Sequence, residues 1–332
     1  MIKPGIQENK PGKDYLNSTN IFMKAIRLHA KGGAEQIAYE EAPIPELLEG
    51  DALVRVLASG ITTNELNWEP TYHDDKGNSR LPSIPGHELC GIVEKIPFGT
   101  TRFTVGDHVY ALTSFFRNGT AAEFVAVEAQ RLAPKPLTLN AAQAASLPLS
   151  ALTAWQALFD YGGLLPGQKV LIHGAGGGVG SLAVQIARWR GATVIGTADA
   201  ASIDLVKGLG AHQVINYKEE RFEEVISDVD LVLDSIGGDT QDRSWQVVKR
   251  GGILVSIAGE SIKEPPPEFD VQGKFFIVKS NYLQLIEIAR LIDSGYIKPI
   301  IGAIIPLADA RKAFEMTFAS GKKGKIVLQV SE

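Results

Sequence analysis

The sequence predicts an α/β protein with two parts, a compact barrel-like β domain and a domain built on a doubly wound parallel sheet. Short runs of alternating or β-branched residues between turns dominate the first half of the chain, whereas apolar strands separated by helices dominate the second. A glycine-rich string between a strand and a helix marks the start of the second part. These three observations define the fold class that we expect.

Composition limits the classes of protein to which the chain can belong. Its 332 residues suffice for two domains, and its 21% of charged residues is too balanced for a disordered chain. No apolar run approaches the roughly 18 residues of a membrane-spanning helix, and a net charge of −5 disfavours nonspecific nucleic-acid binding. The single cysteine, Cys90, excludes an internal disulfide and an all-cysteine metal site. We therefore expect a soluble, cytoplasmic protein with no nucleic-acid or membrane partner.

The β domain is expected to begin after a polar stretch, residues 1–22, that has the composition of a disordered extension. Alternation and β-branched residues, punctuated by prolines and glycines, then predict short strands. These strands are expected at 51–58, 91–94 and 108–111. The polar, turn-rich segment 70–80 is expected to be an exposed loop.

Strands alternate with helices from about residue 147, which implies right-handed crossovers between parallel strands. The expected strands cover 169–173, 193–196, 213–215, 230–234 and 253–257, and the expected helices cover 180–190, 202–209 and 240–249. The final elements, helices at 281–293 and 307–319 and strands at 300–305 and 325–330, are expected to return to the first domain. We place the first domain at 23–146 together with 288–332, and the second at 147–287.

The glycine string from His173 to Gly180 carries the strongest chemical signal. It follows an apolar strand and opens an amphipathic helix, so backbone N–H groups at the helix start can approach a phosphate that a Cβ would keep away. A turn kept only for close helix–strand packing is the alternative, and the strand–helix units around the string disfavour it. The sequence predicts dinucleotide binding at Gly174, Gly177, Gly178, Val179 and Gly180.

The choice of dinucleotide depends on Asp199, which lies at or one place past the end of the second expected strand. An acidic residue there binds the ribose hydroxyls and repels a 2′-phosphate, and no Lys or Arg lies between Ala198 and Val206, which favours NAD. The alternative role of Asp199 is to cap the following helix, since Asp is favoured at that position.

Seven motifs follow one another in a consistent order along the chain. They are residues 23–25 (MKA), 85–91 (PGHELCG), 105–109 (VGDHV), 147–155 (LPLSALTAW), 173–180 (HGAGGGVG), 214–217 (VINY) and 324–328 (GKIVL). Together they resemble the medium-chain dehydrogenase/reductase family, in its zinc-independent branch of quinone oxidoreductases related to zeta-crystallin. The resemblance covers residues 23–330, nearly the whole expected folded length.

This resemblance implies a GroES-like catalytic domain built from both ends of the chain, a Rossmann domain between them, an active site in the cleft and a homodimer. It also implies NADPH as cofactor, with contacts at Thr153, Gly177, Val179, Gly180, Tyr217, Ser256, Ile257 and Ala258. The basic residue that usually follows the second strand is missing here, and Tyr217, Lys218 or Arg221 are the candidates to compensate. We expect NADP(H) slightly ahead of NAD(H).

The zinc alcohol dehydrogenases of the wider family hold their metal with two cysteines and a histidine. Thr62 and Leu149 stand at the positions that resemble the two cysteines, and His87 retains the histidine. A hydroxyl and an isobutyl group cannot replace two thiolates, so we expect no zinc. A residual metal site of His87 with Glu65 or Glu88 is the alternative to a structural histidine.

Without a metal to stabilise an alkoxide, alcohol oxidation is disfavoured, and hydride transfer from a reduced nicotinamide to a quinone or an α,β-unsaturated carbonyl is favoured. Residues expected to line the substrate pocket and to donate to the developing oxyanion are Thr62, Asn64, Asn67, Trp68 and Tyr72. The sequence offers no general acid, so water or a chain of hydroxyls is expected to supply the proton. Two other functions stay open: a cofactor-binding redox sensor or structural protein with little catalysis, and a zinc-dependent alcohol dehydrogenase.

Overall fold

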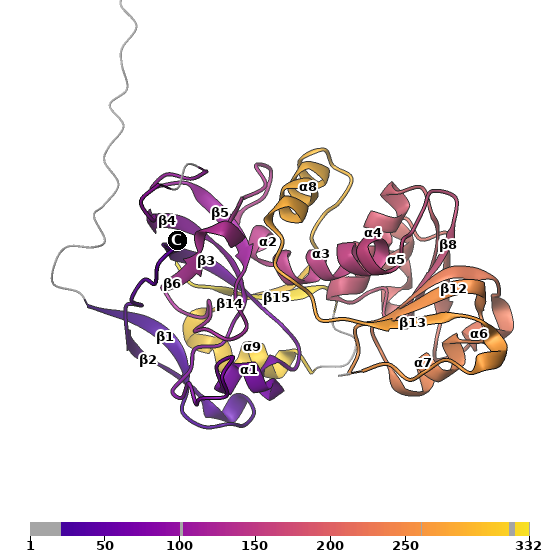
Figure 1. The fold of residues 1–332 in the computed structure, drawn as a ribbon, viewed down its shortest axis with the longest axis horizontal. Coiled ribbons are helices and arrows are strands. Elements are labelled where there is room, and N and C mark those ends of the chain that lie inside the picture. The colour runs from indigo at the N-terminus through magenta and orange to yellow at the C-terminus, as the bar shows by residue number, and fades with distance from the viewer. Residues whose placement is uncertain (1–20, 100–101, 260, 319–322, 332) are drawn as a thin grey trace, which may run out of the picture.

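A computed structural model describes residues 21–99, 102–259, 261–318 and 323–331. Two bodies stand next to each other in Figure 1: a β-rich body that contains both ends of the described chain, and an α/β body formed by its middle. The predicted fold class is confirmed. The expected disordered extension lies outside the described residues except for Ile21 and Phe22, and Phe22 already begins the first strand.

The β-rich body is built on a seven-stranded sheet with the order β14-β15-β3-β4-β5-β7, in which β6 also pairs with β3. The central strand β3 (Asp51–Ile61) is buried along almost its whole length, which explains its run of apolar residues. The other strands are β4 (Glu88–Lys95), β5 (His108–Leu112), β6 (Phe124–Glu128), β7 (Ala133–Pro134), β14 (Ile301–Pro306) and β15 (Lys325–Gln329). The strands expected at 51–58, 91–94 and 108–111 are confirmed.

A hairpin and short helices also belong to this body, among them α2 (Ala141–Ala145), which contacts β3 and β4. Strands β1 (Phe22–Leu28) and β2 (Ile37–Pro43) form a separate antiparallel pair, and α9 (Ala310–Met316) contacts β2 and β15. Helix α1 (Glu69–Tyr72) occupies the start of the segment expected to be a loop. That segment is therefore part helix, because Pro70 is well suited to the first turn of a helix.

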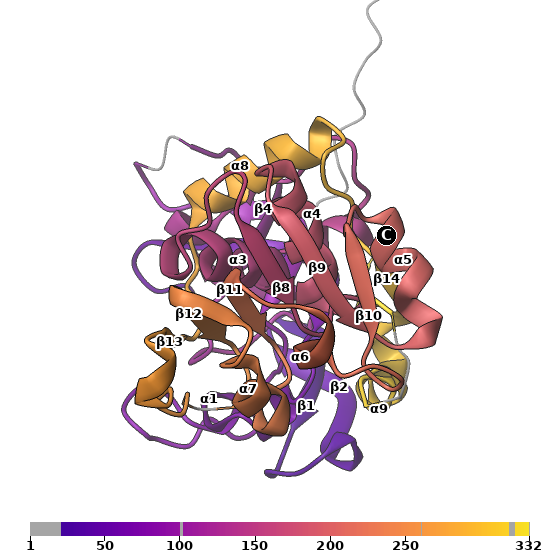
Figure 2. The ribbon, with the colours of Figure 1, turned by 90° about the vertical axis from the view of Figure 1, so that its right-hand side faces the viewer.

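The α/β body contains six parallel strands in the order β10-β9-β8-β11-β12-β13. Figure 2 faces this sheet, with β8 between β9 and β11. The chain runs from β8 outward through β9 to β10 and then crosses to β11 on the other side, so the two halves of the sheet meet at β8 and β11, where doubly wound sheets bind ligands. The strands are β8 (Lys169–Ile172), β9 (Thr193–Ala198), β10 (Gln213–Asn216), β11 (Val229–Asp234), β12 (Val248–Ser256) and β13 (Gln272–Phe275).

The helices of this body are α3 (Pro148–Trp155), α4 (Gly178–Trp189), α5 (Ile203–Gly208), α6 (Phe222–Val225), α7 (Gly238–Ser244) and α8 (Tyr282–Asp293), and α2 precedes them. Helices α4, α5, α7 and α8 lie where the sequence predicts helices, whereas none is predicted at α3 or α6. The helix expected at 240–249 is too long, because Val248 already pairs with Val229 as part of β12. The helix expected at 307–319 begins as a 3-10 turn (Leu307–Asp309) and only then becomes α9.

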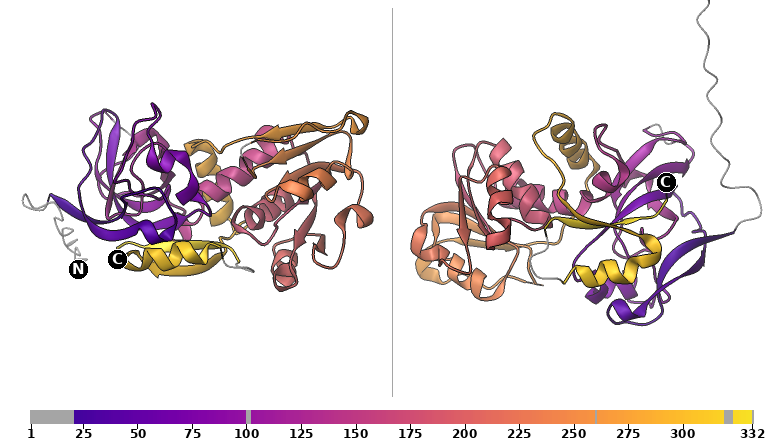
Figure 3. Two further views of the ribbon diagram at one scale, coloured as in Figure 1. Left: turned by 90° about the horizontal axis from the view of Figure 1, so that it is seen from below. Right: turned by 180° about the vertical axis from the view of Figure 1, so that it is seen from behind.

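Two segments connect the bodies. Helix α8 contacts both α3 and β7, so the domain boundary expected at 287/288 falls inside this helix, and we propose that the division lies at one of its ends. Strands β14 and β15 then carry the chain back, and Figure 3 shows this yellow segment lying against the β-rich body. Among the helices that the structure describes, none combines the length and the apolar character needed to cross a membrane.

Candidate functional site

Three glycines shape the loop between β8 and α4, and they have different tasks. Gly174 adopts φ +65°, and a Cβ on Gly180 would lie 2.2 Å from the Gly174 carbonyl oxygen, so both serve the close packing of helix on strand. A Cβ on Gly177 would meet just one described atom, the Gly174 oxygen, at 3.2 Å. The space in front of Gly177 is therefore open, beside N–H groups of the first turn that have no partner inside the helix. This is the cradle that a pyrophosphate requires.

The returning C-terminal segment borders the same loop. The Gly324 N–H donates to the Gly176 carbonyl at 3.4 Å. A Cβ on Gly178, the first residue of α4, would lie 3.4 Å from Ser150 Oγ and 3.5 Å from Lys325 Cδ. A lysine from the β-rich body therefore lies near the start of the helix that is predicted to bind phosphate, with Val179 in the same first turn.

The stretch Ser256–Ala258, an expected cofactor contact, follows the end of β12. The Ser256 hydroxyl is buried and donates to Asp234 Oδ2 at 3.0 Å, while the Ile257 N–H donates to the Asp234 carbonyl at 2.9 Å. The side chain of Ser256 thus helps to hold the neighbouring turn. Its contribution to cofactor binding stays a prediction.

Thr153 and Tyr217 lie on opposite sides of the loop. The Thr153 hydroxyl is buried in α3 and donates to the Leu149 carbonyl at 2.7 Å. The Tyr217 side chain is 56% exposed, and its N–H donates to the Ala198 carbonyl at the end of β9. Tyr217 therefore stands beside Asp199, where an adenosine would lie, and both contacts stay predictions.

Asp199 directly follows β9 and precedes the 3-10 turn Ala200–Ser202. It occupies the capping position, but its side chain makes no capping hydrogen bond, so the capping alternative is wrong. Its Oδ1 is buried and finds no hydrogen-bond partner among the described residues. A carboxylate oxygen in this condition needs a donor, and the ribose hydroxyls of a dinucleotide are donors of the right kind.

The position that resembles the zinc cage holds a cluster of three side chains. Glu88 is fully buried at the start of β4 and forms an ion pair with Lys325, whose side chain is 9% exposed. Thr62 Oγ1 lies between them, 3.2 Å from Lys325 Nζ and 3.4 Å from Glu88 Oε2. The other carboxylate oxygen accepts the Leu149 backbone N–H at 2.9 Å. Both oxygens of Glu88 are therefore occupied, and a cation already stands at this position.

The His87 side chain, next to Glu88 in the sequence, lies in an aromatic cage formed with Trp68 and Phe115. Its ring stacks on Trp68 and meets Phe115 edge-on, with centroid distances of 6.1 and 4.9 Å. Neither ring nitrogen has a hydrogen-bond partner of normal geometry among the described residues, although the backbone of Ser114 approaches it. Burial lowers the pKa of the imidazole to about 3, so His87 is neutral at physiological pH.

These donors do not fit a zinc ion. Leu149 contributes no donor atom from its side chain, Glu88 is already paired with an ammonium group, and the His87 ring is enclosed by carbon. Within the described ranges, no three His, Cys, Asp or Glu side chains are grouped so that they could hold a metal ion. No step of the chemistry is therefore assigned to a metal.

Glu65 fixes the loop that contains Thr62 through hydrogen bonds to backbone N–H groups. Its carboxylate is buried and accepts the Thr62 N–H at 2.9 Å and the Gly86 N–H at 2.7 Å. Burial raises the pKa of this carboxyl to about 7, and the two N–H bonds and Lys325 oppose that rise. Glu65 is thus a positioning residue and not a metal ligand.

The five expected pocket residues are only partly brought together. Thr62 and Trp68 flank His87 and Glu88, whereas Asn64 and Asn67 are exposed on the turn around Glu65. Tyr72 is 1% exposed, and its hydroxyl donates to the Leu66 carbonyl at 2.5 Å. Tyr72 is therefore removed from the candidate donors, because its proton is already used inside the protein.

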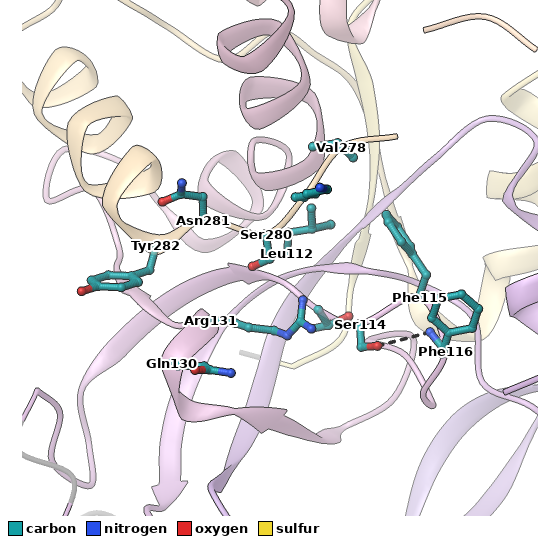
Figure 4. Close-up of a pocket in the computed structure, with 12 residues that line it drawn as sticks. Leu112, Ser114, Phe115, Phe116, Gln130, Arg131, Val278, Ser280, Asn281 and Tyr282 are labelled. Carbon is teal, nitrogen blue, oxygen red and sulfur yellow. Dashed lines mark hydrogen bonds between the residues drawn. The ribbon is translucent and has the colours of Figure 1, made fainter. Parts of the chain in front are cut away.

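A cavity of about 490 Å³ opens beside the aromatic cage (Figure 4). Phe115 and Phe116 form one wall, and Arg131, Gln130 and Ser114 form its floor below Ser280 and Asn281. The complete lining is Leu112, Thr113, Ser114, Phe115, Phe116, Gln130, Arg131, Val278, Lys279, Ser280, Asn281 and Tyr282. It combines apolar surface with a few polar groups, as small-molecule sites do.

The cavity lies at the same edge of the parallel sheet as the predicted nucleotide site. Residues 278–282 follow the carboxyl end of β13, the glycine loop follows β8, and Asp199 follows β9. These ends share one edge of the parallel sheet, so a dinucleotide that lies along this edge would direct its far end toward the cavity. Phe115 connects the cavity with the aromatic cage, because it lines the cavity and also contacts His87.

Sequence reasoning missed the roles of Lys325 and Phe115. Lys325 had one visible signal, a lysine that opens the apolar strand Ile326-Val327-Leu328, where burial of a charge demands a partner. Phe115 had none, because its partners Trp68 and His87 are distant in the sequence.

Comparison with known families and proteins agrees with this geometry. Residues 48–137 match the family described as "Alcohol dehydrogenase GroES-like domain", and residues 209–328 match "Zinc-binding dehydrogenase". A protein of Arthroderma benhamiae named "Probable zinc-binding oxidoreductase, mitochondrial" is 34% identical over 305 residues, covering 87% of this chain and 91% of its own.

Two further matches extend over similar lengths. The "NADPH-dependent alkenal/one oxidoreductase, chloroplastic" of Arabidopsis thaliana is 33% identical over 315 residues, covering 90% of this chain and 78% of its own. The solved quinone oxidoreductase from Coxiella burnetii is 29% identical, with a TM-score of 0.84, covering 93% of this chain and 99% of its own.

Proposed function

Because this chain belongs to the medium-chain dehydrogenase/reductase family, we propose that it is a zinc-independent, NAD(P)H-dependent reductase that transfers hydride to a quinone or an α,β-unsaturated carbonyl. The observation that supports this function best is the cluster of Lys325, Glu88 and Thr62 beside an open dinucleotide cradle. An ammonium–carboxylate pair cannot bind an alkoxide as zinc does, whereas an already electrophilic acceptor does not need that help.

A bound reduced nicotinamide supplies the hydride, and negative charge develops on the carbonyl oxygen of the acceptor. Thr62 is the residue of the cluster suited to meet that charge, because it is half-buried and Lys325 Nζ polarises its hydroxyl from 3.2 Å. Its bond to Glu88 is long, at 3.4 Å, so its proton is free to turn toward an acceptor. The remaining proton comes from water or through this hydroxyl.

The aromatic residues in and beside the cavity would hold the acceptor in a fixed position against the cofactor. Phe115 lines the cavity and Trp68 contacts it edge-on in the adjoining aromatic cage, so both offer aromatic surface to a planar quinone or enone, and the neutral His87 ring packs against both without adding charge. Such placement contributes to the rate by fixing the acceptor against the cofactor. Asn64 and Asn67, on the exposed turn, do not line this cavity, and they remain proposed as substrate-pocket residues.

The test is the loss of reduced-nicotinamide absorbance with a quinone and with a short enone, each with NADH and with NADPH. Turnover of either acceptor that persists after chelation, in protein with no stoichiometric zinc, is the expected result. Thr62→Val should lower kcat while leaving the dissociation constant of the cofactor unchanged. Leu139→Val, a conservative change in a residue packed on the core away from this cluster, is the matched control.

Each competing function predicts a different outcome. Tight cofactor binding without turnover of a broad panel of acceptors would favour a redox sensor or a structural protein. Stoichiometric zinc, with activity that chelation abolishes, would favour an alcohol dehydrogenase. Neither result is expected, because the cavity combines apolar surface with a few polar groups and the Lys325 ammonium already stands at the cage position.

The homodimer and the cytoplasmic location also remain proposals. Strand β13 forms one edge of the six-stranded sheet, and Ile277 just beyond it is 66% exposed, so a second copy has an edge to pair with. Sedimentation velocity measures this directly. Two of the matched relatives are named for mitochondria and for chloroplasts, and fractionation of the source cells would decide the location of this protein.

A further inference from the structure

Two residues that line the cavity in Figure 4 carry a buried polar atom with no hydrogen-bond partner among the described residues. These atoms are Ser280 Oγ, in the segment between β13 and α8, and Arg131 Nε, in the 3-10 turn Ala129–Arg131. A buried donor without an acceptor raises the free energy of the empty protein, and a ligand that supplies the acceptor recovers that cost. The cavity is therefore suited to a ligand that accepts hydrogen bonds.

The Arg131 guanidinium has donors to spare. Its Nε lies 2.9 Å from Glu128 Oε2 in an ion pair, although the angle does not suit a hydrogen bond. Within the described part of the chain, its terminal nitrogens donate to no other group. A guanidinium carries five N–H donors in a planar fork, so the edge that does not face Glu128 can meet a ligand.

Positive charge predominates around the cavity. Its lining includes the cations Arg131 and Lys279 but no Asp or Glu. Arg102 adds a cation at the edge, because its guanidinium carbon lies 4.1 Å from the centroid of the Tyr282 ring, which lines the cavity. The 12-residue helix α8 begins at Tyr282, so the positive end of its dipole lies here as well. Glu128 offsets one of these charges, and the remainder favours an anion.

The wall that contains Ser280 is held in place by its neighbours. The buried Gln156 side chain fixes the backbone of Lys279, since it donates to the carbonyl at 2.7 Å and accepts the N–H at 3.0 Å. On the other side, the Asn281 side chain caps α8 by accepting two backbone N–H groups. Ser280 is thus positioned before a ligand arrives, which lowers the entropy lost on binding.

We propose that this cavity selects acceptors that carry a carboxylate, which Arg131 binds on one side and Ser280 on the other. This inference rests on the proposed function, because it names a substrate class for the same reductase. A carboxylate is planar and matches the fork of a guanidinium, and its oxygens also accept from a serine hydroxyl. Phe115 stands between this site and the aromatic cage, so the planar electrophilic part of such an acceptor would lie beside the cage.

Naphthoquinones with carboxyalkyl chains of increasing length, compared with the primary amides of the same chains, provide the test. The measured quantity is the ratio of kcat/KM for the acid to kcat/KM for the amide, at one ionic strength. At the chain length that reaches Arg131, the acid should be favoured by at least ~10-fold. Arg131→Gln should remove most of that preference. Ser280→Ala should lower it several-fold without lowering the melting temperature, because the hydroxyl has no partner in the described protein.

Two further variants complete the set. Arg290→Gln is the matched control, because Arg290 also pairs with a glutamate three residues earlier, Glu287, but is exposed on α8 and does not line the cavity. It should leave the ratio unchanged. Glu128→Gln removes the carboxylate that competes for the Arg131 guanidinium, so it should raise the preference for the acid.

The outcomes separate this inference from the function beneath it. Turnover of acids and amides with equal kcat/KM at every chain length would overturn the inference and leave the reductase in place. A preference for the acid that both Arg131→Gln and Ser280→Ala leave unchanged would do the same. Failure of the protein to reduce any acid or amide would overturn the proposed function and the inference together. If Arg131→Gln does not fold, the ratio in Ser280→Ala decides.

Discussion

The predicted nucleotide site and the cage position differ in whether their buried carboxylates have hydrogen-bond or ion-pair partners. At the nucleotide edge, Gly177 leaves open space and Asp199 leaves a buried oxygen without a partner. At the cage position, both oxygens of Glu88 are occupied, by Lys325 on one side and by the Leu149 N–H on the other. The first region therefore has an open space and an unpaired acceptor that a ligand could fill, whereas the polar groups of the second region are already paired within the protein.

This contrast explains how one family scaffold supports a different chemistry. A metal cage stores its positive charge in an ion that polarises the substrate directly. Here the charge belongs to Lys325, whose Nζ contacts the Thr62 hydroxyl and whose Cδ would lie 3.5 Å from a Cβ placed on Gly178 at the start of α4. On the function proposed above, this cation lies between the Thr62 hydroxyl and the predicted nucleotide site, and the acceptor must already be electrophilic.

The largest expected effect comes from removing the cation of the cluster formed by Lys325, Glu88 and Thr62. Lys325→Met leaves the Glu88 carboxylate buried without its cation, so we expect a loss of about 3–5 kcal/mol in the free energy of unfolding. Lys325→Met combined with Glu88→Gln should recover most of that loss. Denaturant unfolding measures both, and Lys323→Met, at an exposed position two residues earlier, is the control. Equal stability of Lys325→Met and Lys323→Met would show that the Lys325–Glu88 ion pair does not stabilise the fold.

Acid should destabilise the protein through its buried histidines. His87 and His173 have pKa values lowered by burial to about 3 and about 4, so each binds a proton on unfolding below pH 6.5. Glu65, raised by burial to about 7, acts in the opposite sense between pH 4.5 and 7, because its proton is lost on unfolding. The balance of about one proton predicts a fall of about 1.4 kcal/mol per pH unit from pH 6.5 to 4.5.

Unfolding curves at three pH values across that range measure this slope. His87→Phe, which keeps an aromatic ring in the cage, should bring the slope close to zero, since the remaining histidine and Glu65 then balance. A slope in that variant equal to that of the parent protein would mean that His87 is not buried in its neutral form.

Two glycines of one loop should separate stability from binding. Gly180→Val forces a side chain against the Gly174 carbonyl and should cost about 1–3 kcal/mol of stability. Gly177→Val meets little in the free protein, so its stability should hold, but its side chain fills the cradle and should weaken cofactor binding by about tenfold, or about 1.4 kcal/mol. Calorimetry and thermal unfolding distinguish the two, and unchanged affinity in Gly177→Val would place the pyrophosphate elsewhere.

The smallest expected effect concerns Tyr72. Its hydroxyl is bonded to the Leu66 carbonyl, so Tyr72→Phe should cost about 1 kcal/mol of stability and leave kcat unchanged. A lower kcat at full stability would return Tyr72 to the set of oxyanion donors.

Prediction from sequence succeeded where neighbours in the chain carry the signal. The glycine string, its preceding strand and its following helix are contiguous, and the period of apolar residues fixes their type. It failed at the end of the helix expected at 240–249, since Val248 is drawn into β12 by its pairing with Val229. It also failed at Tyr72. A tyrosine hydroxyl can serve as a donor to substrate, but here it already donates to the Leu66 carbonyl in the 65–67 turn.

The sequence by itself determined the fold class, the glycine loop between strand and helix, and the loss of the thiolates, because each depends on residue type and local spacing. Only the tertiary structure decided which cation stands at the cage position and which buried carboxylate oxygen finds no partner among the described residues. Lys325 meets Glu88 and Thr62 across more than two hundred residues of chain, and the burial of Asp199 Oδ1 depends on the packing of two loops. Charge and burial at a point in space belong to all the segments that meet there, and no single segment of sequence contains them.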